Sequence, residues 1–122
     1  MQVKFVDLIA QYNELRPQID SAIARVLESA IFIGGSEKTE FESSFSRYLG
    51  AKHCIGVGNG TDALYIALKS TGIGAGNEVI VPANTFIATA EAVEMTGAKV
   101  VFVDCCEHSY NLSLEDLKSK VT

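Results

Sequence analysis

Residues 1–50 carry their apolar side chains at helical spacing. Between Asp7 and Ser29 the apolar positions recur every three or four residues, which predicts an amphipathic helix. Pro17 lies inside this pattern, and its missing N–H predicts either a kink or a division into two helices. The positions expected to face inward are Leu8, Tyr12, Leu15, Ile19, Ile23, Val26 and Leu27.

A second helix is predicted from Ser36 to Gly50. Ser36 is a favourable N-cap residue, and Gly50 is suited to ending a helix in the left-handed conformation. The segment Ile31–Gly35 between the two helices ends in paired glycines and predicts a loop. The expected inward stripe of the second helix is Phe41, Phe45, Tyr48 and Leu49.

After Gly50 the pattern changes to short apolar runs that alternate with helical segments. The runs predict strands at Cys54–Val57, Glu78–Val81 and Lys99–Asp104. Helices are predicted between them at 61–70, with Leu64, Ala67 and Leu68 on one face, and at 86–96, with Ile87, Ala90 and Val93 on one side. This alternation predicts right-handed βαβ units and a parallel sheet, hence an α/β fold. Because three such strands make a small sheet, we expect the chain to be the first part of a larger fold.

A last helix is predicted to start at Ser113. The Ser113 hydroxyl is expected to cap the helix while Asp116 reaches back to it, as in a capping box. Leu114, Leu117 and Val121 are expected on its inner face.

Composition narrows the possible functions of this 122-residue chain. Lys and Arg total 10 against 15 Asp and Glu, a net charge of −5, which argues against nucleic-acid and anionic-membrane partners. No apolar run of about 18 residues and no signal-like N-terminus occurs, so we expect a soluble, cytoplasmic protein. The 3 cysteines form no CxxC pair and no zinc-ligand spacing, so we expect free thiols and no metal site.

The segment Gly58–Leu64, between a predicted strand and a predicted helix, has the chemistry of an anion site. A helix start offers free N–H groups and the positive end of the helix dipole, and Gly60 lets a ligand approach the backbone. The Thr61 hydroxyl adds a donor, while Asp62 stabilises the helix start. The alternative is a capped Asn-Gly turn that binds nothing. A dinucleotide fingerprint is not complete, because Thr61 stands where its third glycine belongs.

Two further strand ends carry candidate residues. Phe86, in the segment Val81–Thr89, is placed to stack on a planar ligand at the carboxyl edge of the sheet, or else to be the first core residue of its helix. Asp104 follows the last predicted strand and is either a functional acid or a cap of the next turn.

Taken in order, these motifs resemble the start of a DegT/DnrJ/EryC1/StrS sugar aminotransferase. The matching segments are Phe5–Leu8, Phe32–Gly35, Gly58–Leu64, Val81–Thr89, Phe102–Asp104 and Tyr110–Leu112. The resemblance implies the parallel-sheet large domain of the pyridoxal-phosphate-dependent, type I aspartate-aminotransferase fold. Residues 1–122 would then be a single unit, with N-terminal helices at 1–50 and the first part of the cofactor-binding α/β domain at 51–122.

The resemblance also implies an activity. Members of this family aminate a keto group at position 3 or 4 of a dTDP-, UDP- or GDP-linked sugar in amino-sugar and polysaccharide biosynthesis, and glutamate is the expected amino donor. Gly60, Thr61 and Asp62 fall where the family holds the phosphate of pyridoxal 5'-phosphate, and Phe86 falls where an aromatic ring stacks on the pyridine.

The remaining parts of the implied active site lie elsewhere. The loop around Ile33–Gly35 falls near the subunit interface of an expected homodimer, close to the nucleotide sugar. The Schiff-base lysine and the acid that pairs with the pyridine nitrogen are expected beyond residue 122, so no catalytic residue is assigned here and the isolated chain is expected to be inactive. A sugar dehydratase of the same family, or a non-catalytic ligand-binding or regulatory protein on this fold, remains the alternative.

Overall fold

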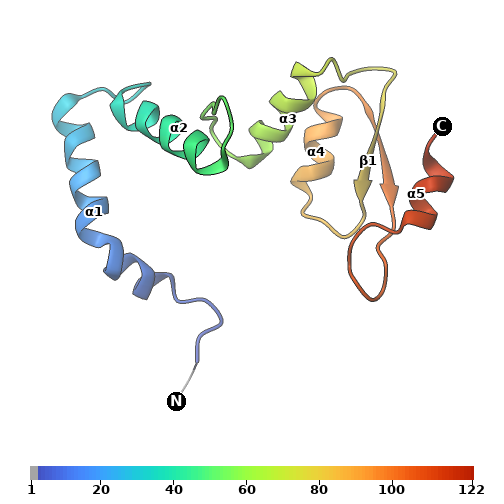
Figure 1. The fold of residues 1–122 in the computed structure, drawn as a ribbon, viewed down its shortest axis with the longest axis horizontal. Coiled ribbons are helices and arrows are strands. Elements are labelled where there is room, and N and C mark those ends of the chain that lie inside the picture. The colour runs from blue at the N-terminus through green and yellow to red at the C-terminus, as the bar shows by residue number, and fades with distance from the viewer. Residues whose placement is uncertain (1–2) are drawn as a thin grey trace. The chain divides into compact units, whose positions relative to one another are not determined.

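The computed structural model describes residues 3–122, which form five helices and two strands (Figure 1). The chain divides into two compact units, the first ending at Gly56 and the second beginning at Val57. Over the described residues, no helix combines the length and the apolar character that crossing a bilayer requires.

The first unit contains α1 (Leu8–Ser29) and α2 (Ser36–Leu49). Asp7 caps α1, because its Oδ1 accepts a hydrogen bond from the Ala10 N–H at 3.0 Å. The helix continues through Pro17, so the predicted division into two helices is wrong. One missing N–H removes a single intrahelical bond, and the neighbouring bonds of a 22-residue helix hold the two sides together.

Glycines flank helix α2 at both ends. Ser36 is its first helical residue rather than the predicted N-cap, which is Gly35. Gly35 has a φ of 82°, a conformation that serine adopts only with strain, so the chain turns into the helix one residue earlier than expected. At the other end Gly50 has a φ of 64°, as predicted. The rings of Phe41 and Phe45 stack with centroids 5.4 Å apart, yet both remain exposed, as does most of the apolar stripe of α1.

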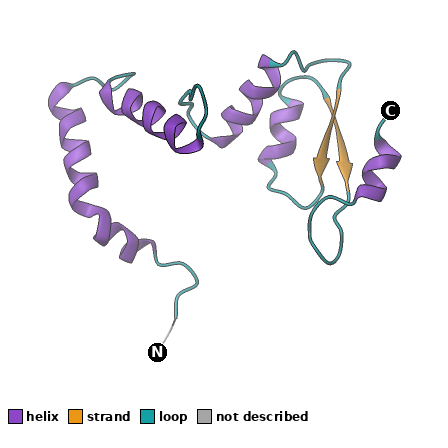
Figure 2. Ribbon diagram, in the orientation of Figure 1, coloured by secondary structure: helices purple, strands orange, loops and turns teal. Residues whose placement is uncertain are grey.

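The second unit is built around a parallel pair of strands, β1 (Glu78–Pro82) and β2 (Lys99–Val103). Figure 2 shows α3 (Gly60–Ser70) and α4 (Ala88–Glu94) on the same side of these strands. Helix α4 packs on both strands and α3 packs on α4. The small core consists of Val81, Val93 and Ala98, with Leu68, Ile73, Val79 and Val100 packed against it. The predicted parallel arrangement of these two strands is confirmed.

The predicted strand at Cys54–Val57 is wrong. A strand exists only where its backbone groups pair with a neighbour, and in the described residues β1 and β2 pair with each other alone. The Gly56 N–H instead donates to the Glu42 Oε1 at 2.7 Å. An apolar run without a ladder partner is therefore a connecting segment here.

Helix α5 (Leu114–Lys120) lies beside β2 and provides a hydrogen-bond donor to the outer edge of that strand. The Lys120 amine donates to the Phe102 carbonyl at 2.7 Å, a group that an open sheet edge would leave unpaired. Ser113 caps the helix by accepting from the Asp116 N–H, as predicted. The expected return contact is wrong, because the Asp116 carboxylate accepts from the Asp104 N–H at 2.7 Å instead.

Several residues expected to face inward are exposed in this structure. Leu117 is half-buried in α5, but Leu114, the first residue of that helix, and Val121, which follows its last residue, are exposed. In α4 the predicted positions Ala90 and Val93 are buried, whereas Ile87 precedes the helix and is exposed. In α3 the predicted inward positions Leu64 and Ala67 are exposed and Leu68 is half-buried. Helical spacing therefore identifies the buried face only where another element packs on it, as on α4.

Candidate functional site

Helix α3 begins in a turn that Asn59 organises. The Asn59 backbone is extended, with a φ of −164°, and its Oδ1 accepts from the Asp62 N–H at 3.0 Å. Its Nδ2 donates to the Asp62 Oδ2, also at 3.0 Å. The one amide side chain thus holds both the backbone and the carboxylate of Asp62. Asn59 was not among the residues expected to form the site, although asparagine before a helix is a strong N-cap signal.

The predicted residues Gly60 and Thr61 carry the free donors of this helix start. Their backbone N–H groups make no hydrogen bond within residues 3–122, and neither does the Thr61 hydroxyl. A Cβ built on Gly60 would meet nothing within 4 Å, so the backbone there is open to an approaching group. Two N–H groups, a hydroxyl and the positive end of the helix dipole make this turn suited to an anion such as a phosphate.

Asp62 faces the turn, and its carboxylate is directed back along the chain. A Cβ built on Gly58 would lie 2.7 Å from the Asp62 Oδ2, closer than such atoms approach in proteins. Glycine at position 58 therefore lets the carboxylate reach Asn59. The negative charge is held by that amide donor, and the side chain shapes the turn that presents Gly60 and Thr61.

Phe86 lies in the segment that connects β1 to α4. Its side chain is 77% exposed, so the interpretation as the first core residue of a helix is wrong for this chain. The predicted helix at 86–96 is shorter than expected, since α4 begins at Ala88 and ends at Glu94. The Thr89 N–H donates to the Phe86 carbonyl at 3.0 Å, which forms a tight turn at the start of α4. The ring therefore stands free after the end of β1.

The two strands end at the same edge of the sheet, because they are parallel. Phe86 follows Pro82 at this edge, and Asp104 follows Val103. The Asp104 Oδ1 accepts from the Cys105 N–H at 2.7 Å, so Asp104 caps the turn after β2. Ligands of open α/β sheets bind outside this carboxyl edge, which is where the exposed Phe86 ring lies.

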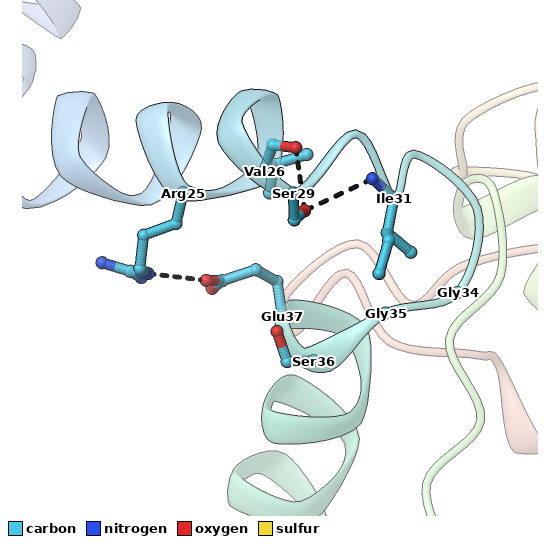
Figure 3. Close-up of a pocket in the computed structure, with 8 residues that line it drawn as sticks. All are labelled: Arg25, Val26, Ser29, Ile31, Gly34, Gly35, Ser36 and Glu37. Carbon is cyan, nitrogen blue, oxygen red and sulfur yellow. Dashed lines mark hydrogen bonds and ion pairs between the residues drawn. The ribbon is translucent and has the colours of Figure 1, made fainter.

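A small pocket lies in the first unit, where α1, the loop after it and the start of α2 meet (Figure 3). Arg25 Nε and Glu37 Oε1 are 2.9 Å apart across it, and the Glu37 carboxylate raises the pKa of the Arg25 guanidinium. With a volume of roughly 100 Å³ it is smaller than a typical ligand pocket of about 300–1,000 Å³. The loop expected near the nucleotide sugar lines this pocket, which is too small to hold a nucleotide sugar by itself. The lining residues are Arg25, Val26, Ser29, Ile31, Gly34, Gly35, Ser36 and Glu37.

The fold and these residues define a class of protein. The chain is the beginning of an α/β domain in which free N–H groups at a helix start can bind an anion, and an exposed aromatic ring lies at the carboxyl edge of the strands. The chain belongs to the DegT/DnrJ/EryC1/StrS aminotransferase family, whose model matches residues 13–122. The family and fold class expected from the sequence are thereby confirmed.

Individual relatives agree with this assignment. The chain is 43% identical over 120 residues to the UDP-2-acetamido-2-deoxy-3-oxo-D-glucuronate aminotransferase of Pseudomonas aeruginosa, covering 98% of this chain and 33% of that protein. It matches the crystal structure of Streptomyces venezuelae DesV in complex with a ketimine intermediate, with a TM-score of 0.93 and 45% identity over 99% of this chain and 33% of that one. The structure of Bacillus subtilis NtdA with bound cofactor PMP gives a TM-score of 0.91 at 30% identity, over 99% of this chain and 28% of that one. The chain therefore spans about a third of the length of these relatives.

Proposed function

We propose that this chain is the N-terminal part of a pyridoxal-phosphate-dependent aminotransferase that aminates a nucleotide-linked keto sugar. The substrate class is a dTDP-, UDP- or GDP-linked 3- or 4-keto sugar, and glutamate is the amino donor. The observation that carries the proposal is the unpaired donor set of Gly60 and Thr61 at the start of α3. Family membership supports it, as does the Pseudomonas aeruginosa relative, which is named for a UDP-linked 3-oxo sugar.

The residues present fit the cofactor. The N–H groups of Gly60 and Thr61 and the Thr61 hydroxyl would hold its phosphate, and Asp62 would shape the turn that presents them. The exposed ring of Phe86 would cover one face of its pyridine. When bound, pyridoxal phosphate supplies the electron sink for amino transfer.

This chain's contribution to the reaction is binding and orientation. Donors at a helix start fix the anionic end of the cofactor, and a planar side chain restricts the tilt of its ring. Once both ends are fixed, the reacting carbon has a set position relative to the groups that act on it. The lysine and the acid expected beyond residue 122 would supply those groups.

A second copy of the chain is the proposed partner. Ile31, Phe32 and Ile33 are 56%, 68% and 94% exposed, and they lie next to the exposed apolar stripe of α1 in the sequence. A cluster of exposed apolar side chains along the chain favours an interface at this place. We infer that the full-length enzyme is a homodimer, that it works in the cytoplasm, and that residues 1–50 and 51–122 form parts of one cofactor-binding domain.

The proposed activity is tested with the full-length enzyme, pyridoxal phosphate, ¹⁵N-labelled glutamate and a panel of dTDP-, UDP- and GDP-linked keto sugars. Mass spectrometry should detect a nucleotide sugar that carries ¹⁵N. A product that has lost water without gaining nitrogen would instead identify a dehydratase. Binding of the sugar without any reaction would identify a non-catalytic protein.

A further inference from the structure

The segment Ala83–Thr89 carries the ring proposed to cover the cofactor, and within residues 3–122 that ring is not part of the core. Phe86 is 77% exposed, so its position depends on the backbone on either side. The segment is fixed at its start, where the Ala83 N–H donates to the Val103 carbonyl at 2.8 Å. It is fixed again where the Thr89 N–H donates to the Phe86 carbonyl at 3.0 Å.

A third contact spans Phe86 directly. The hydroxyl oxygens of Thr85 and Thr89 are 3.1 Å apart, a hydrogen bond in which either group donates. Thr85 precedes Phe86, and Thr89 lies in the first turn of α4. The two hydroxyls therefore close a loop of contacts across Phe86, Ile87 and Ala88.

We propose that Thr85 and Thr89 are positioning residues that hold Phe86 in the orientation in which its ring covers the cofactor. This inference rests on the proposed function, because it assigns the two threonines to the same site. Threonine suits the task, since its branched Cβ leaves few side-chain conformations and its hydroxyl both donates and accepts. A segment held in its bound conformation loses less freedom when the ligand binds, so the hydroxyl pair raises affinity without contacting the ligand.

The first test compares Thr85→Val and Thr89→Val with wild type in the full-length apoenzyme. Valine keeps the branched shape and removes the hydroxyl. Titration with pyridoxal phosphate, followed by protein fluorescence, should show an affinity about three- to tenfold weaker for each variant, the effect of one neutral hydrogen bond. Thr85→Ser should restore the wild-type affinity. Thr71→Val is the matched control, because the Thr71 hydroxyl makes its bonds at the end of α3, to Leu68 and Ala67.

The second test asks whether the hydroxyls act through Phe86. In a Phe86→Ala background, Thr85→Val should cause no further loss of affinity, and the visible circular dichroism of the bound cofactor should be the same in the single Phe86→Ala variant and the double variant. A further loss in that background would overturn the inference, because it would mean that the hydroxyl contacts the cofactor itself.

The outcomes separate this inference from the proposed function. If Phe86→Ala weakens binding while the two valine variants bind normally, the positioning role is wrong and the proposed function stands. If Phe86→Ala itself leaves affinity and circular dichroism unchanged, the stacking role of Phe86 is wrong as well. Thermal unfolding of each apoenzyme shows whether a variant has folded, and where one valine variant does not fold, the other carries the test.

Discussion

The Glu42 carboxylate and the backbone N–H of Gly56 are joined by a hydrogen bond of 2.7 Å. Glu42 lies in the middle of α2 and is also paired with Lys38 one turn earlier. The Lys38 ammonium and then the Gly56 N–H lower the pKa of the Glu42 carboxyl below its usual value. One side chain therefore ties the segment that leads out of the first unit to the helix before it.

This contact predicts a pH dependence of stability. Because the folded pKa of Glu42 lies below the unfolded value of about 4.5, the bond contributes stability above that pH and loses it as the pH falls through the folded pKa. Glu42→Gln should therefore lower the urea midpoint of the full-length protein at neutral pH, and the difference from wild type should shrink on acidification. Glu40→Gln, on the same helix, is the control. Equal midpoints for wild type and Glu42→Gln at every pH would show that the contact is not stabilising.

Substitution by alanine should have different effects on stability and cofactor affinity at Gly58 and Gly60, the two glycines of the turn before α3. At Gly58 a methyl group would displace the Asp62 carboxylate, so Gly58→Ala should lower the unfolding free energy of the apoenzyme by about 1 kcal/mol, the size of one hydrogen bond. At Gly60 the space is open, so Gly60→Ala should leave apoenzyme stability nearly unchanged yet weaken cofactor binding, because the methyl group stands where the phosphate would approach. Differential scanning calorimetry and a cofactor titration separate the two effects. Gly60→Ala with unchanged cofactor affinity would argue against a phosphate at this position.

The free energy of unfolding should depend on the contact between Lys120 and the outer edge of β2. Lys120→Met keeps the length of the side chain and removes the amine that bonds to the Phe102 carbonyl and to the Asp116 carboxylate, so the unfolding free energy should fall by about 1 kcal/mol. Lys118→Met, on the same helix, is the matched control. If both variants unfold at the same denaturant concentration as wild type, the contacts of the Lys120 amine add no net stability.

The apolar loop after α1 should determine assembly. Ile33 is 94% exposed in this chain, and a charge there would be buried without a partner in a dimer interface. Sedimentation of the full-length protein at micromolar concentration should show a dimer for wild type and a weaker dimer for Ile33→Asp. Gln18→Asp adds the same charge on the exposed surface of α1 and should leave the dimer intact. An active wild-type monomer would contradict this proposal.

Local chemistry made much of the fold predictable. Gly50 ends a helix and Ser113 caps one because a single residue and its neighbours decide these features. The pairing of β1 with β2 followed from two apolar runs joined by a helix. The run Cys54–Val57 has the same pattern but no ladder, since strand formation depends on a partner that the run itself does not encode.

The site was predictable in part for the same reason. The turn at Gly60 and Thr61 follows from a strand-like run, glycines and a helix start, whereas the exposure of Phe86 depends on where α4 begins. The direction of the Asp62 carboxylate depends on the amide of Asn59 and the bare backbone of Gly58. Such contacts are set by side-chain geometry, which spacing along the chain does not specify.

The Thr61→Val variant shows whether the start of α3 holds the cofactor phosphate. Full-length wild type and variant are titrated with pyridoxal phosphate and with pyridoxal, which lacks the phosphate, by absorbance and fluorescence. Loss of one hydrogen bond to a charged group should weaken pyridoxal phosphate binding about ten- to a hundredfold and leave pyridoxal binding unchanged. If a folded Thr61→Val variant binds pyridoxal phosphate as tightly as wild type, the turn at Asn59, Gly60 and Thr61 is a capped helix start and not the phosphate site.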